Sequence, residues 1–253
     1  MRPDLPALLA DLRAEQADLC ALVERSDLAL ATPAQGWDVR DAVAHLAGTD
    51  VEATRAARDP AGFVAALPDD VAGLLEGQLV LRRSLSRDQL LGSWQGGFAA
   101  MTAAFAALDP AATVPWYGPP MSPASFVTAR LMEYWAHGQD VADAAGVRRE
   151  PTDRLRHVCH LGVRTRGFSY VVSGLPVPAG DVRVEVVAPG GGTWSWGTGT
   201  DLVTGSALDL CLLVTQRRHR EDTDLVATGP LGAEWLMIAQ CFAGPPGPGR
   251  ARA

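Results

Sequence analysis

Hydrophobic residues change their spacing once along this chain, and this change limits the possible folds more than any other feature. Up to about Tyr170 they recur roughly every three or four residues, as on one face of a helix. From Val182 to Val186 they alternate with charged residues, as in a strand. We therefore predict the α+β class, with a helical first domain over residues 1–172 and a small α+β second domain over residues 173–253.

Prolines and capping residues divide the helical part into expected helices over residues 5–30, 38–58 and 70–108, the stretch that carries Glu133 and His137, and a stretch after Pro151. Asp38 is the expected N-cap of the second helix. The third contains a further N-cap signal at Ser84–Ser86, where we expect it to bend or break.

The second domain is expected to contain strands over residues 182–186, 193–197 and 225–228 and helices over residues 204–213 and 231–242. Gly190–Gly192 lies between the first two strands and is not followed by a helix. This segment therefore predicts a hairpin turn and not a phosphate-binding loop.

Glu133 and His137 lie four residues apart in the segment Arg130-Leu-Met-Glu-Tyr-Trp-Ala-His-Gly-Gln-Asp140. In a helix this spacing turns the side chain by about 40° and raises it by roughly 6 Å, so the two project side by side. Asp140 falls on nearly the same line. Most apolar residues of this helix lie elsewhere, so its polar flank faces either solvent or a polar pocket. The pair is either a solvated helical pair or two metal ligands.

His45 offers a third ligand from another helix. Val39, Val43 and Leu46 mark the core-facing stripe of that helix, and His45 lies roughly 110° from its centre. Such edge positions line the cavities of helical bundles. Spacing alone does not show that the two helices meet.

Two segments, Gly36-Trp-Asp-Val-Arg-Asp-Ala-Val-Ala-His-Leu46 and Arg130–Asp140, resemble the metal-binding signatures of the mycothiol-dependent maleylpyruvate isomerase family. The likeness spans nearly the whole chain, and an uncharacterised branch of the family is similar at residues 116–122, 216–219 and 239–250. The resemblance implies a DinB-like four-helix bundle followed by a sterol-carrier-like domain. It also implies that His45, Glu133 and His137 bind a metal ion.

The same resemblance implies an arginine that reaches the metal site and binds carboxylates. Val214-Thr-Gln-Arg217 matches the family pattern, which favours Arg217 in catalysis and in cofactor binding. The alternative is a cation that meets the dipole at the end of its helix. Arg82 and Arg83 are weaker candidates for the same role.

Further residues are expected around the metal. Asp140 would act in catalysis by orienting a ligand or a water molecule without binding the metal itself. Trp37 would wall the cavity and contact the cofactor, and Trp116 and Tyr117 could do the same, although core packing is the plain alternative for each.

Two imidazoles and one carboxylate suit zinc, or nickel as the second choice, and leave coordination positions open. We therefore expect a metal-dependent enzyme that uses a mycothiol-like thiol to isomerise or S-conjugate a small electrophile. The alternatives are a thiol-independent metal enzyme that hydrolyses, cyclises or isomerises a metabolite, and a metal- or ligand-binding protein without turnover.

Composition excludes several other classes. The net charge of −7 argues against a nucleic-acid partner. The chain has no lysine and no asparagine, which excludes Schiff-base lysine chemistry, a P-loop lysine and N-glycosylation. No signal peptide and no apolar run of membrane-spanning length appear, so we expect a cytoplasmic protein without a membrane partner.

Cysteines and the remaining histidines give no second site. Cys159 lies between His157 and His160 but points to another side of the helix, so the three do not converge. The histidines are better explained as residues on a helix surface. The other cysteines fall in apolar helical patterns and are expected to be buried thiols, namely Cys20, Cys211 and Cys241.

Overall fold

The computed structural model describes residues 4–247 and 249–252, and the chain forms two compact units that divide between Arg148 and Arg149. Helices α7 (Leu155–Arg164) and α8 (Arg166–Val172) belong to the second unit. The expected boundary at residues 172/173 thus lies after this structural division. The hydrophobic spacing of α7 and α8 is helical, like that of the preceding helices. This spacing does not indicate to which of the two units these helices belong.

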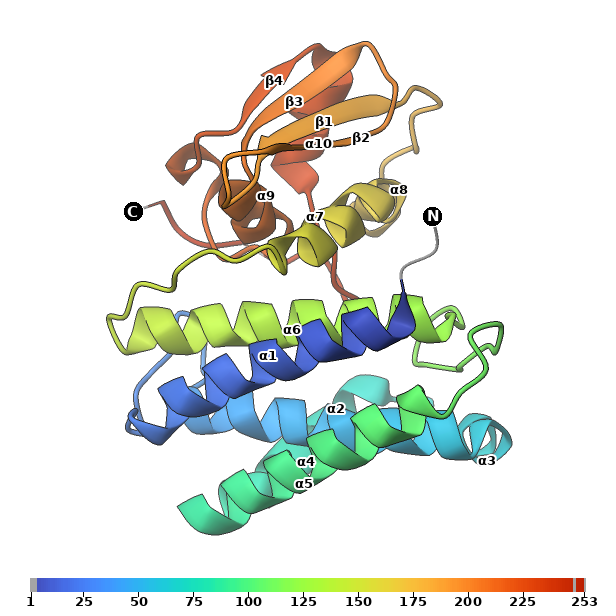
Figure 1. Ribbon diagram of the computed structural model, residues 1–253, viewed down its shortest axis with the longest axis vertical. Helices are drawn as coiled ribbons and strands as arrows, with labels where there is room; N and C mark the ends of the chain where they lie inside the picture. Colours follow the sequence, from blue (N-terminus) through green and yellow to red (C-terminus); the bar gives the residue numbers. More distant parts are fainter. Residues whose placement is uncertain (1–3, 248, 253) are drawn as a thin grey trace. The chain divides into compact units, whose positions relative to one another are not determined.

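The first unit is a bundle of four long helices with two shorter ones: α1 (Leu5–Glu24), α2 (Val39–Arg58), α3 (Pro60–Ala65), α4 (Val71–Arg83), α5 (Arg87–Ala106) and α6 (Pro123–Ala144). In Figure 1, α1 runs alongside α6 and α5 alongside α2, and the shorter α3 and α4 pack on α2. The core is filled by large side chains such as Leu46, Trp94 and Phe126. Full burial of a leucine or phenylalanine side chain stabilises a fold by roughly 1.5–3 kcal/mol, and such burial holds these helices against one another.

Capping residues begin two of these helices where the sequence predicts. The Asp38 carboxylate accepts from the Asp41 N–H at 2.9 Å, and the Asp41 carboxylate accepts from the Asp38 N–H at 3.3 Å. This capping box begins α2. Ser86 and Gln89 form the same box at the start of α5, so the predicted break of the long third helix is confirmed.

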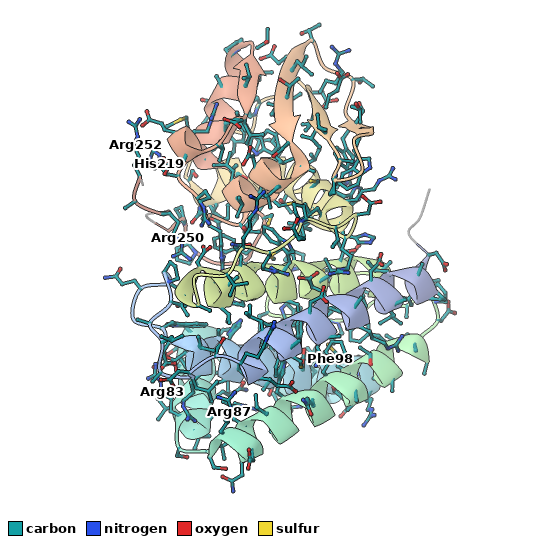
Figure 2. All side chains as sticks on the ribbon, turned by 60° about the vertical axis from the view of Figure 1, so that its left-hand side comes forward. Arg83, Arg87, Phe98, His219, Arg250 and Arg252 are labelled. Carbon is teal, nitrogen blue, oxygen red and sulfur yellow. The ribbon has the colours of Figure 1, made fainter. Side chains whose placement is uncertain are left out.

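The first helix ends at Glu24, so its expected end at Leu30 is wrong. The guanidinium of Arg87 on α5, labelled in Figure 2, donates to the carbonyl oxygens of Val23 and Glu24 at 2.8 and 3.0 Å. Carbonyls in the last turn of a helix lack partners within the helix. Arg87 thus stabilises the end of α1 through a side chain that is distant in the sequence.

The second unit contains a mixed sheet in the order β2-β1-β3-β4, formed by β1 (Val182–Val187), β2 (Thr193–Trp196), β3 (Asp201–Ser206) and β4 (Val226–Thr228). β1 pairs antiparallel with β2 and parallel with β3. α9 (Ala207–Val214) packs on β1 and β3, and α10 (Pro230–Ile238) packs on β3 and β4 (Figure 1). The predicted hairpin is confirmed, since Ala188 N–H donates to Gly192 O at 2.7 Å and Gly191 has φ of +85°.

Two expectations for this unit are wrong. Residues 204–206 lie in β3 and not in a helix, and α9 begins only after Ser206, whose hydroxyl accepts from the Asp209 N–H. The last helix ends at Ile238 and not at residue 242. The chain becomes extended at Ala239 because Gln240 N–H donates to the Ser169 hydroxyl at 3.0 Å and Cys241 N–H donates to Val214 O at 2.8 Å.

A helical unit followed by a unit that combines helices with a small sheet confirms the predicted α+β class. None of the helices described in residues 4–247 and 249–252 is both long and apolar enough to cross a lipid bilayer.

Candidate metal centre

Three side chains of the first unit converge, His45 from α2 and Glu133 and His137 from α6. Glu133 Oε2 lies 3.6 Å from His45 Nε2 and 3.4 Å from His137 Nε2. The three ligand atoms all lie within 4.8 Å of one another, and no other such group of His, Cys, Asp or Glu occurs among the described residues. Ligand atoms at about 2.0–2.1 Å from a tetrahedral zinc ion are separated by about 3.4 Å. The two separations from Glu133 fit this geometry.

The site is partly open. The exposed fraction of the side chain is 21% for His45, 25% for Glu133 and 10% for His137. The polar flank of α6 therefore contacts α2 instead of projecting freely into solvent. Part of each of the three side chains remains accessible to water. Such a site can hold an ion and still admit a ligand from one side.

Electrostatics favour the protonation states that metal ligands need. Burial alone would raise the pKa of Glu133, but hydrogen bonds from His137 and His45 hold this pKa well below its usual value. Burial lowers the pKa of His45, and the hydrogen bond with Glu133 offsets only part of this effect. Near neutral pH the site therefore presents an ionised carboxylate and a neutral His45 imidazole.

Trp37 and Asp140 both lie against His137. The Trp37 ring stacks on the His137 ring with centroids 5.5 Å apart and planes 14° apart, and it lies 5.3 Å from the His45 ring. Asp140 is fully buried, and its Oδ2 lies 3.3 Å from His137 Nδ1. Asp140 Oδ2 is therefore close enough to Nδ1 to act on the orientation of the imidazole, and this orienting role stays a prediction.

Arg82 and Arg83 differ in their surroundings. Arg83, the last residue of α4 (Figure 2), makes a two-pronged contact with Asp41 at 2.7 and 3.0 Å and so joins α4 to α2. This contact gives Arg83 a structural role. Arg82 is half-buried and donates to Gln78 O of its own helix at 3.2 Å, beside Gly48 of α2.

Arg217 lies in the second unit, just after α9. Its backbone N–H donates to Leu212 O at 2.7 Å, and its guanidinium donates to Thr215 O at 2.7 Å. Gln216 before it adopts the left-handed conformation, with φ of +57°. Arg217 therefore lies where the chain turns sharply at the end of α9. Its role in binding carboxylates stays a prediction.

Other side chains singled out in the sequence take part in packing. Trp116 packs on Phe63 and Phe126, with ring centroids 5.8 and 4.9 Å apart. The Tyr117 hydroxyl donates to Glu52 at 3.3 Å. These contacts favour the packing alternative for both aromatic residues.

The prediction of buried thiols is confirmed for Cys211 and Cys241, whereas Cys20 is only half-buried. Cys159 is buried as well. The Cys159 sulfur lies 3.4 Å from that of Cys211, while His160 is exposed. Cys159 thus faces the interior of its unit and does not join the neighbouring histidines in a site.

Sequence reasoning missed a charged pair in the core of the bundle, Asp50 and Arg130. Arg130 Nη2 donates to Asp50 Oδ1 at 2.9 Å. A signal was present, because Asp50 follows Val43 and Leu46 by seven and four residues and therefore falls on the apolar stripe of its helix. A carboxylate on such a stripe requires a buried partner.

A family model described as the mycothiol maleylpyruvate isomerase N-terminal domain matches residues 9–142. Two similar proteins, both called uncharacterised, come from two strains of Mycobacterium tuberculosis. Each is 46% identical over 250 residues, which cover 96% of this chain and 97% of the relative.

Two solved structures have a similar fold, the mycothiol-dependent maleylpyruvate isomerase and a histidine-to-alanine mutant of it, with TM-scores of 0.65 and 0.64. The likeness covers 91% of this chain and 96% of each of those chains, at 15% sequence identity. At this identity it shows the fold alone, and it confirms the predicted order of a helical domain followed by an α+β domain.

Proposed function

Since this chain belongs to the mycothiol maleylpyruvate isomerase family, we propose that it is a metal-dependent enzyme that uses a low-molecular-weight thiol to isomerise or S-conjugate a small electrophile. The observation that carries this proposal is the convergence of His45, Glu133 and His137. Maleylpyruvate itself is not proposed as the substrate, because the identity to that isomerase is only 15%.

The residues present fit a divalent cation. Two imidazole nitrogens and one carboxylate oxygen are donors that zinc prefers, and nickel accepts the same set. Three protein ligands leave a position for an external ligand, in agreement with the partial exposure of His45 and Glu133. A cation held there would supply Lewis acidity and stabilise a thiolate near neutral pH.

Residues of this chain would prepare the site for that chemistry. Glu133 supplies the negative charge, and Asp140 holds the His137 imidazole with Nε2 toward Glu133. Trp37 stacks on the His137 ring and lies tilted against the His45 ring, which would limit the rotation of both imidazoles. Arg217 is proposed to bind a carboxylate of the substrate.

The proposed isomerisation starts when the thiolate sulfur adds to one carbon of a conjugated double bond and the electron pair moves onto the conjugated carbonyl. The former double bond is then a single bond and rotates. Return of the electron pair expels the thiolate and restores the double bond in the other configuration. In S-conjugation, a proton is added to the adduct instead, and the carbon–sulfur bond is kept.

Replacing Asp140 with asparagine is expected to weaken zinc binding by about 10–100-fold, as loss of an outer partner of a ligating histidine generally does. The asparagine fills the same volume but carries no charge to hold the His137 imidazole. Zinc affinity would be measured by competition with a chelating dye. The control is Asp143→Asn on the same helix, whose carboxylate accepts from the Gln139 amide at 2.8 Å and which should bind zinc normally. Equal affinities in the two variants would argue against the orienting role.

The thiol requirement is tested with the metal-loaded full-length protein and a panel of conjugated unsaturated acids. We expect turnover with added mycothiol and none after exhaustive removal of small thiols. Turnover that persists without thiol would contradict the proposal and favour a metal-activated water molecule in hydrolysis or cyclisation. Metal binding without any turnover would favour a binding protein.

A further inference from the structure

A chain of hydrogen bonds joins three helices in the core of the first unit. Arg130 on α6 donates to Asp50 on α2 at 2.9 Å, and the Tyr134 hydroxyl on α6 donates to the other Asp50 oxygen at 2.5 Å. The Trp94 indole on α5 in turn donates to the Tyr134 hydroxyl at 2.8 Å. Phe98 of α5, labelled in Figure 2, packs edge-on against the Tyr134 ring.

This network is not exposed to water. Asp50, Tyr134 and Trp94 are 0% exposed, and Arg130 is 4% exposed. Removal of two charges from water carries a large desolvation penalty, so well-packed apolar residues would often stabilise a core as well as a buried ion pair does. Stability alone therefore does not explain why a charged pair occupies this core. Polar contacts of this kind are instead suited to selecting one register between helices.

The network joins the same two helices that supply the metal ligands. On α2, Asp50 follows His45 by five residues, and on α6, Arg130 precedes Glu133 by three. Tyr134 directly follows Glu133. A shift of α2 along α6 would therefore break the contacts of Asp50 and move His45 away from Glu133 at the same time. A shift by one residue is about 1.5 Å, whereas a metal site tolerates about 0.5 Å.

We propose that Asp50, Arg130 and Tyr134 are positioning residues of the metal centre, which set the register of α2 against α6 and so bring His45 to Glu133 and His137. They act through the two helices and do not contact the metal. This inference rests on the proposed function only in requiring that the three ligands bind a metal ion.

The first test is Tyr134→Phe in the full-length protein, which removes one hydroxyl and keeps the ring. We expect the dissociation constant for Zn²⁺, measured by chelator competition, to rise about tenfold, at the lower end of the effect of outer-shell changes. The absorption bands of bound Co²⁺, which report coordination geometry, should shift as well. The matched control is Tyr170→Phe in the second unit, because Tyr170 is also buried and its hydroxyl also donates to a carboxylate, Glu234, at 3.0 Å.

The second test separates positioning from stability. Asp50→Leu combined with Arg130→Met replaces the charged pair with apolar side chains. We expect thermal unfolding close to the parent temperature, because both buried charges are removed together, and zinc binding weakened at least tenfold. A purely structural role would leave zinc affinity unchanged in this variant. Should the double variant fail to fold, Tyr134→Phe decides the question alone.

The outcomes are distinct. Parent-like zinc affinity in Tyr134→Phe, or an equal loss in Tyr170→Phe, overturns the positioning role while the metal centre itself stands. If the unsubstituted protein does not bind Zn²⁺ or Co²⁺, the proposed function fails, and the positioning role fails with it.

Discussion

Replacement of His137 with alanine is expected to abolish metal retention while the helical content stays close to that of the unsubstituted protein. One of three protein ligands is lost, so the effect should exceed the roughly 10–100-fold change that follows loss of an outer partner. The His137 side chain is only 10% exposed, but it lies beside the partly exposed side chains of His45 and Glu133. Metal per chain would be measured after gel filtration, and helical content by circular dichroism.

The chain offers a matched control for this experiment. His160→Ala removes an exposed imidazole from α7 and should leave the metal content unchanged. Stoichiometric metal in His137→Ala would show that the ligand assignment is wrong. Loss of metal together with loss of helix would point to unfolding instead, and Asp140→Asn would then provide the milder test.

Replacement of Asp50 with alanine is expected to destabilise the bundle by about 3–5 kcal/mol, as removal of one partner of a buried ion pair does. Burial acts to lower the pKa of Arg130, but the Asp50 carboxylate raises it and holds the guanidinium charged. Without Asp50 the buried Arg130 guanidinium lacks the carboxylate that pairs with it, and the Tyr134 hydroxyl lacks its hydrogen-bond acceptor. The loss would be measured by urea denaturation, for the transition of the helical unit.

The variant for comparison with Asp50→Ala is Arg83→Ala, which removes one partner of the Arg83–Asp41 ion pair. The Arg83 side chain is 41% exposed, and the Asp41 carboxylate, although only 5% exposed, keeps its hydrogen bond from the Asp38 N–H, so the destabilisation should be smaller. Similar losses in the two variants would mean that water reaches Asp50 and Arg130, in conflict with their burial. The double replacement of Asp50 and Arg130 by apolar residues should restore most of the stability lost in Asp50→Ala.

Several elements of the fold could be predicted from the sequence because their signals are local. Asp38 and Ser86 begin their helices through hydrogen bonds to the backbone three residues later. Strand β3 was missed because only Val203 of its six residues is buried, which hides the alternation expected of a strand. Its place beside β1 is set by pairing across the sheet.

The candidate site could be predicted only in part. The spacing of Glu133 and His137 placed both on one flank of a helix, but it left open whether this flank faces solvent. The family resemblance, and not the spacing, pointed to the meeting with His45. Asp50 lies on the apolar stripe of its helix, which signals a buried partner, but nothing in the sequence identifies Arg130 as that partner.

Neighbours within about one helical turn suffice to place the caps, turns and faces of this protein, because backbone hydrogen bonds and side-chain spacing act over that range. The contact of His45 with Glu133 and the pairing of Asp50 with Arg130 instead depend on how α2 packs against α6. Burial of apolar surface, which drives that packing, is not directional, and it acts between residues far apart in the chain. For this reason the candidate metal centre forms only when α2 and α6 pack against each other.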